Sequence, residues 1–183
     1  MFYHEGICYR QINPVYKECC DYFLESCLYQ KFVNEKLVTP HETVSSSHRP
    51  FFGGYLAIRP EPIAFLSYPY EWCFTKFKKA ALATLDISKH ALDHNTILKY
   101  PNIYNIQFNI GQPLSIDILS FEKYKEGRLG RVIKSFAKNF LGPLALMSYK
   151  YTRLGLMLRE YIEGIPLDSL SHRKQKPCLT KNL

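Results

Sequence analysis

Tyr104-Asn-Ile-Gln-Phe-Asn-Ile-Gly-Gln-Pro-Leu-Ser-Ile-Asp117 is the stretch of this sequence with the clearest fold signal. It predicts two short strands joined by a tight turn at residues 109–112. Gly111 can adopt the positive φ that such a turn requires. We therefore expect an antiparallel hairpin, with Asn105 just before its first strand and Asp117 near the end of its second.

Asn105 and Asp117 are the candidate metal-binding residues of this chain. Their side chains carry the oxygen atoms that hard cations prefer. Phosphotransferases place their two magnesium ligands in this order, with an Asn after the catalytic loop, then a hairpin, then an Asp. The two residues are thus candidates for binding Mg²⁺ and ATP. The alternative is structural: Asn105 caps a turn and Asp117 accepts backbone hydrogen bonds.

The other parts of a kinase active site are missing from the sequence. A kinase has a catalytic Asp five residues before this Asn, and Tyr100 stands there instead. A phenol cannot replace the carboxylate that orients and deprotonates a hydroxyl. No glycine-rich loop with the kinase spacing precedes the strands, since Gly53-Gly54 alone is a weak signal, and Arg59 is the nearest cation to a strand end. We assign no catalytic residue and expect no phosphoryl transfer.

The remaining patterns predict an α+β fold, with a few short antiparallel strands followed by a mostly helical body. The order of the elements also resembles a kinase-like arrangement. That resemblance implies a hinge at Tyr68–Trp72, where Glu71 is a candidate cofactor-binding residue or caps the following helix. In the helix that follows, Phe74, Phe77, Ala81, Leu85 and Leu92 are expected to share one face. The predicted strands are Tyr55–Arg59 and Ile63–Ser67, and the predicted helices are 14–36, Cys73–His94, Arg128–Tyr149 with a break at Gly142-Pro143, and Tyr151–Glu163.

Composition indicates one globular domain at residues 1–170. Of the 183 residues, 46% are hydrophobic and 15% are aromatic, which is typical of a filled core. No apolar run approaches the length that spans a bilayer. The six cysteines include no CxxC pair, so a zinc site is not expected. We interpret them as reduced thiols and expect a cytoplasmic protein.

Part of the formal charge of +8 comes from the last residues, 171–183, which hold four basic side chains and no acidic one. We expect this segment to be a basic, flexible, solvated tail. The alternative is a contact with nucleic acid or an acidic membrane, and a basic nucleic-acid-binding module is one hypothesis for the whole chain.

Characteristic runs of sequence occur at Tyr9–Pro14, Ser67–Trp72, Ala80–Leu85, Tyr104–Phe108, Ile116-Asp117, Leu119–Tyr124, Pro143–Tyr149 and Tyr161–Asp168. With these runs, residues 8–170 resemble the N-terminal accessory region of bacterial class I SAM-dependent methyltransferase-like proteins, a group that includes a nodulation-protein branch. The resemblance implies an accessory, non-catalytic domain, free-standing or truncated. Its partner would be a methyltransferase domain or another protein chain.

The methyltransferase core of that family is not recognisable in this sequence. Such a core needs a glycine-rich turn after a strand, so that the backbone can approach the cofactor. The chain has nine glycines and no GxGxG or GxGxxG motif. We therefore expect it not to bind SAM and not to be active alone. A degenerate, kinase-like protein that binds a nucleotide and Mg²⁺ is the alternative.

Overall fold

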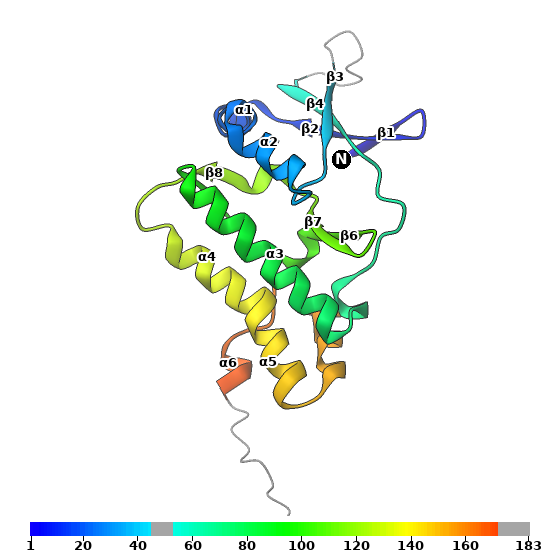
Figure 1. The fold of residues 1–183 in the computed structure, drawn as a ribbon, viewed down its shortest axis with the longest axis vertical. Helices are drawn as coiled ribbons and strands as arrows, with labels where there is room; N and C mark the ends of the chain where they lie inside the picture. Colours follow the sequence, from blue (N-terminus) through cyan, green and yellow to red (C-terminus); the bar gives the residue numbers. More distant parts are fainter. Residues whose placement is uncertain (45–52, 172–183) are drawn as a thin grey trace, which may run out of the picture.

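A four-stranded antiparallel sheet forms one end of the molecule (Figure 1). The computed structural model describes residues 1–44 and 53–171. β4 confirms the strand expected at Tyr55–Arg59, and in the sheet Arg10 lies opposite Ile58. The strand order is β1-β2-β4-β3, and the strands are β1 (Phe2–His4), β2 (Ile7–Ile12), β3 (His41–Val44) and β4 (Leu56–Pro60).

The prediction of a single helix over 14–36 is wrong, because the helix is interrupted at Ser26. The segment forms η1 (Pro14–Tyr16), α1 (Lys17–Glu25) and α2 (Cys27–Asn34). Ser26 is extended, with ψ 146, and its hydroxyl donates to the Phe23 carbonyl at 2.7 Å. A serine side chain that bonds to nearby backbone competes with helix continuation.

The strand expected at Ile63–Ser67 is also wrong. Residues 61–68 connect the sheet to η3 (Pro69–Glu71) without strand pairing. At Ser67 the backbone hydrogen bonds that a neighbouring strand would make are made instead by the side-chain amide of Gln107. It accepts from the Ser67 N–H and donates to the Ser67 carbonyl, both at 3.1 Å. This leaves Phe65 and Leu66 exposed.

α3 (Phe74–Asp93) confirms the long helix and joins two hydrophobic cores. The expected buried face is wrong in part: Leu85 and Leu92 are exposed, and the buried face consists largely of small residues. The sheet-side core contains Ile12, Cys20, Phe23, Leu28, Phe32, Val38, Ile58, Ile87, Ala91, Leu98, Ile118 and Phe121. The helix-side core contains Trp72, Phe77, Ala80, Ala81, Ile103, Ile106, Phe136, Phe140, Leu146, Met147, Leu158 and Ile165.

The predicted hairpin is confirmed as β6 (Ile106–Asn109) and β7 (Gln112–Ser115), which lie between the sheet and the helical body (Figure 1). Both turn residues have positive φ, 48 at Ile110 and 77 at Gly111. A second pair, not predicted, flanks the hairpin in sequence. It joins β5 (Thr96–Leu98) to β8 (Phe121–Lys123). The short 3₁₀ turns η4 (Ile103–Asn105) and η5 (Ile118–Ser120) connect these elements.

The helix expected over Arg128–Tyr149 is continuous through Gly142-Pro143 and instead widens just before it. Lys138 lies in the widened turn, and its carbonyl accepts the Ile165 N–H at 3.0 Å. The chain around Ile165 thus supplies a hydrogen-bond donor to a backbone carbonyl of this helix. Pro143 lies in the first turn of α5, where proline is tolerated. The elements are α4 (Leu129–Phe136), the π-helical η6 (Ala137–Leu141) and α5 (Gly142–Tyr149).

The last predicted helix, Tyr151–Glu163, is a 3₁₀-helix over a shorter range, η7 (Thr152–Arg159). The Tyr104 hydroxyl donates to the Leu158 carbonyl at 2.6 Å, so the hairpin side of the molecule binds the end of this helix. The short α6 (Asp168–Ser171) follows. The structure is therefore α+β, as predicted.

Three other expectations concern the chain as a whole. The described cysteines are free thiols. Within the described residues, no helix is long and apolar enough to cross a membrane. The predicted tail falls almost entirely on residues 172–183, and Cys178 with it, so both lie outside the described part of the chain.

Candidate functional site

A cleft of about 770 Å³ lies between the sheet and the base of the β6–β7 hairpin. Ile116 and Ile118, on either side of Asp117, line it from the hairpin side, and Arg10 and Ile58 line it from the sheet. The chain between the sheet and η3 contributes further residues, among them Ile63 and Leu66. The cleft therefore borders the linker at residues 61–66 and not the Tyr68–Trp72 segment expected to form the hinge.

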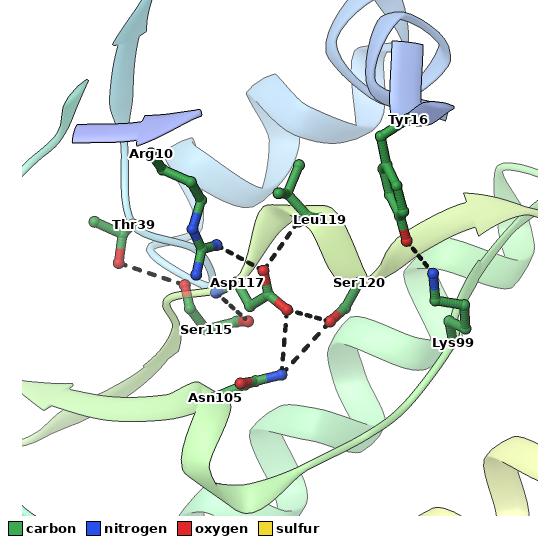
Figure 2. Close-up of polar contacts among 9 residues, drawn as sticks. All are labelled: Arg10, Tyr16, Thr39, Lys99, Asn105, Ser115, Asp117, Leu119 and Ser120. Carbon is green, nitrogen blue, oxygen red and sulfur yellow. Dashed lines mark hydrogen bonds and ion pairs between the residues drawn. The ribbon is translucent and has the colours of Figure 1, made fainter. Parts of the chain in front are cut away.

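Asp117 lies at the centre of a polar network at this place (Figure 2). Its Oδ1 accepts from Arg10 Nη1 at 2.6 Å and from the Leu119 N–H at 3.1 Å. Its Oδ2 accepts from Asn105 Nδ2 at 3.3 Å and from the Ser120 hydroxyl. Both carboxylate oxygens are thus engaged twice, and the prediction that Asn105 and Asp117 lie close together is confirmed.

The local sequence explains why Asp117 stands here. It caps the N-terminus of η5, where a short acidic side chain can accept a backbone N–H two residues ahead. Two residues earlier, Ser115 binds the chain that leads into β3: its N–H donates to Leu37 O at 2.8 Å, and its carbonyl accepts the Thr39 N–H at 2.9 Å. The hairpin base is thereby fixed to the sheet end of the molecule.

The Arg10–Asp117 pair connects residues 107 positions apart. Arg10 comes from β2 of the sheet, and the two side chains are 23% and 19% exposed. A charge-assisted hydrogen bond in a largely water-shielded place is stronger than one on the surface. The pair therefore holds the sheet against the hairpin.

The side chains of this network do not fit a magnesium site as they stand. A metal would need the oxygens of Asn105 and Asp117 to converge. Asn105 instead presents its amide nitrogen to the carboxylate, and its oxygen points away (Figure 2). An ion would have to displace Arg10 or the Ser120 hydroxyl from Asp117. In residues 1–44 and 53–171, no group of three or more His, Cys, Asp or Glu could hold a metal ion.

Glu71 is not brought together with Asn105 and Asp117. Its carboxylate accepts the Tyr68 N–H at 2.8 Å and closes the capping box of η3, so it caps this turn and not α3.

Tyr100 is exposed, and the preceding Lys99 bonds to the Tyr16 hydroxyl. Burial alone lowers the pKa of Lys99, but the hydrogen bond and the charge interaction with Tyr16 outweigh it and raise the pKa.

Arg10 is a site residue that the sequence did not indicate. Arg59 is the nearest cation to a strand end in the sequence, but it pairs with Glu42 on the sheet. The run Ile7-Cys-Tyr-Arg-Gln-Ile12 has apolar residues at both ends of a strand-length segment, so the sequence indicates the strand that carries Arg10 but not its partner Asp117.

His41 is a titratable residue of the cleft. Its Nδ1 lies 2.9 Å from the Tyr29 hydroxyl, and its ring lies 4.7 Å from the Tyr29 ring between centroids. Burial lowers the pKa of His41 below its ordinary value of 6.5, because the charged imidazolium loses solvation. His41 is therefore neutral in the folded protein at neutral pH.

The lowered pKa of His41 predicts a loss of stability in acid. The unfolded chain binds the His41 proton at a higher pH than the folded chain does, so His41 favours unfolding once the pH falls below about 6.5. Urea unfolding at several pH values between about 7.5 and 5.5 should show a steeper fall in stability for the wild type than for His41→Asn. Parallel curves for the two proteins would contradict the assignment to His41.

Comparison with known proteins finds a partial similarity for this chain. No protein-family model matches the sequence, and no solved structure matches it. The nodulation protein NoeA of Rhizobium meliloti (strain 1021) is 34% identical over 132 residues. The alignment covers 72% of this chain and 28% of NoeA. The chain is thus similar to one part of a nodulation protein, and it spans well under two thirds of the length of that protein.

Proposed function

We propose that this chain is an accessory, non-catalytic domain of a SAM-dependent methyltransferase-like protein, and that its sheet, long helix and hairpin form a kinase-like arrangement without kinase activity. Two observations support an accessory role. The similarity to NoeA covers only 28% of that protein. The sequence also resembles the N-terminal region that precedes a methyltransferase core, and it carries no glycine-rich cofactor turn of its own.

The topology supports the kinase-like arrangement. A four-stranded antiparallel sheet has two helices inserted between its second and third strands, and a linker then leads from β4 to the long helix α3. The hairpin that follows α3 carries Asn105 and Asp117 at its base. A cation from the sheet, Arg10, lines the cleft and bonds directly to Asp117.

The observation that supports a non-catalytic role most strongly is the state of the Asp117 carboxylate. Phosphoryl transfer needs such a carboxylate to hold a metal that neutralises the phosphates. Here Arg10, Asn105, Ser120 and the Leu119 N–H already satisfy it. Together with Tyr100 at the position of the catalytic Asp, this favours a structural role for Asp117.

The accessory role is tested by exchanging domains with NoeA. Three purified proteins are compared in titration calorimetry with SAM: NoeA, NoeA without the segment that aligns with this chain, and NoeA with that segment replaced by this chain. The proposal predicts SAM binding by NoeA and by the chimera. It predicts a loss of at least about tenfold, or about 1.4 kcal/mol, in the deletion protein.

This chain alone is the fourth sample, and it should give no binding heat with SAM because it lacks a backbone turn that can approach the cofactor. A one-to-one isotherm for the isolated chain would overturn the non-catalytic assignment. A deletion protein that binds SAM as well as intact NoeA would show that the aligned segment is not an accessory to cofactor binding.

A further inference from the structure

The cleft beside Arg10 has the size of a small-molecule binding site. Its volume of about 770 Å³ lies within the range of small-molecule pockets. Its inner wall includes Ile58 and Ile118, which are 2% and 6% exposed. Its rim carries apolar side chains that solvent still reaches, among them Ile7 and Leu66, which are 37% and 62% exposed.

The arginines along this cleft are already paired with carboxylates. Among the described residues that line it, the arginines are Arg10 and Arg59. Arg10 is paired with Asp117, and Arg59 is paired with Glu42. His41 is neutral because burial lowers its pKa. An anionic ligand would therefore meet no free cationic side chain of this set, while the carboxylate of Glu61 at the edge would repel it.

The backbone at the rim does not form a phosphate-binding loop. β1 and β2 are joined by the two-residue turn Glu5-Gly6, with φ values of 50 and 77. A turn this tight directs few N–H groups toward a common anion, in contrast to the long glycine-rich loops that bind phosphates. The walls thus offer apolar contact without a means of holding phosphate.

We propose that this cleft binds an uncharged, largely apolar small molecule. The ligand covers Ile7, Ile63 and Leu66 at the rim and packs against Ile58 and Ile118 inside. Burial of apolar surface drives its binding, and the arginines already engaged with carboxylates disfavour a nucleotide. This ligand site is independent of the accessory role toward a methyltransferase domain.

The test uses Nile red, an uncharged planar dye that fluoresces in apolar surroundings, with the full chain. The wild type should bind one dye per chain. Leu66→Asp places a charge on the rim and should weaken dye binding at least tenfold. Leu66 is 62% exposed, so this substitution leaves the fold intact. Leu82→Asp is the matched control, since Leu82 is 51% exposed on α3 and does not line the cleft, and it should bind the dye as the wild type does.

Two further measurements distinguish an apolar ligand from a nucleotide and from a second copy of the chain. ATP with Mg²⁺ should leave the bound dye in place, and displacement of the dye would overturn the proposal in favour of a nucleotide. Sedimentation at the assay concentration should show that Leu66→Asp and the wild type have the same oligomeric state. A wild-type dimer that Leu66→Asp dissociates would show that a second copy covers the cleft. Equal dye affinity in the two leucine variants would place the dye elsewhere.

Discussion

Replacing Phe136 with alanine should destabilise the protein by about 3–5 kcal/mol. Phe136 is 8% exposed in the helix-side core and stacks on Phe140, with ring centroids 4.9 Å apart. Its removal leaves a cavity that the packed helices around it can close only in part. Chemical unfolding of the wild type and of Phe136→Ala measures the difference.

Phe65 provides the control for this prediction, because it has the same side chain and is 74% exposed. Phe65→Ala should change the unfolding free energy by no more than about 0.5 kcal/mol. A loss below about 1 kcal/mol for Phe136→Ala would show that α4 does not anchor the core. Equal losses in the two variants would show that burial does not set the cost of the substitution at Phe136.

Gly164→Ala should cost roughly 2–4 kcal/mol. Gly164 has a φ of +89, which an alanine adopts only with strain. A Cβ at this position would also lie 2.8 Å from Lys138 Cβ and 2.9 Å from the Lys138 carbonyl carbon. The carbonyl carbon belongs to the widened helical turn and cannot move away easily, because the carbonyl oxygen accepts the Ile165 N–H.

The hairpin turn supplies a matched control for Gly164. Gly111 has a similar φ of +77, but a Cβ there would meet no atom within 4 Å. Gly111→Ala should therefore cost only the backbone strain, about 1–2 kcal/mol. Thermal and urea unfolding of both variants separate strain from steric overlap. Equal losses at the two glycines would show that the chain at Gly164 is not packed against η6.

Local signals predicted the elements that depend on local contacts. The β6–β7 hairpin closes over a two-residue turn that Gly111 permits, so its residues are neighbours in sequence. The extent of α3 followed from its periodic pattern. Its buried face followed only in part, because close packing of the helix places Ala80 and Ala91 in the cores and leaves Leu85 at the surface.

The candidate site could be predicted only in part, because only part of it depends on contacts between residues close in sequence. Asn105 and Asp117 are 12 positions apart, and the hairpin between them places them together. Arg10 reaches Asp117 only after β2 has paired with β4, some 45 residues further along the chain, and the sheet has packed against the hairpin. No local pattern encodes such a contact, so the role of Arg10 emerges from the fold alone.

The structural role of Asp117 is tested most directly by thermal unfolding of the wild type and Asp117→Ala, each with and without saturating ATP and Mg²⁺. We predict that Asp117→Ala lowers Tm by roughly 5–10 °C without any ligand, because Arg10 and the Leu119 N–H lose their acceptor. We also predict that ATP and Mg²⁺ leave the Tm of both proteins unchanged. A ligand-dependent rise in the wild-type Tm that disappears in Asp117→Ala would contradict this account and show that Asp117 binds a metal–nucleotide complex.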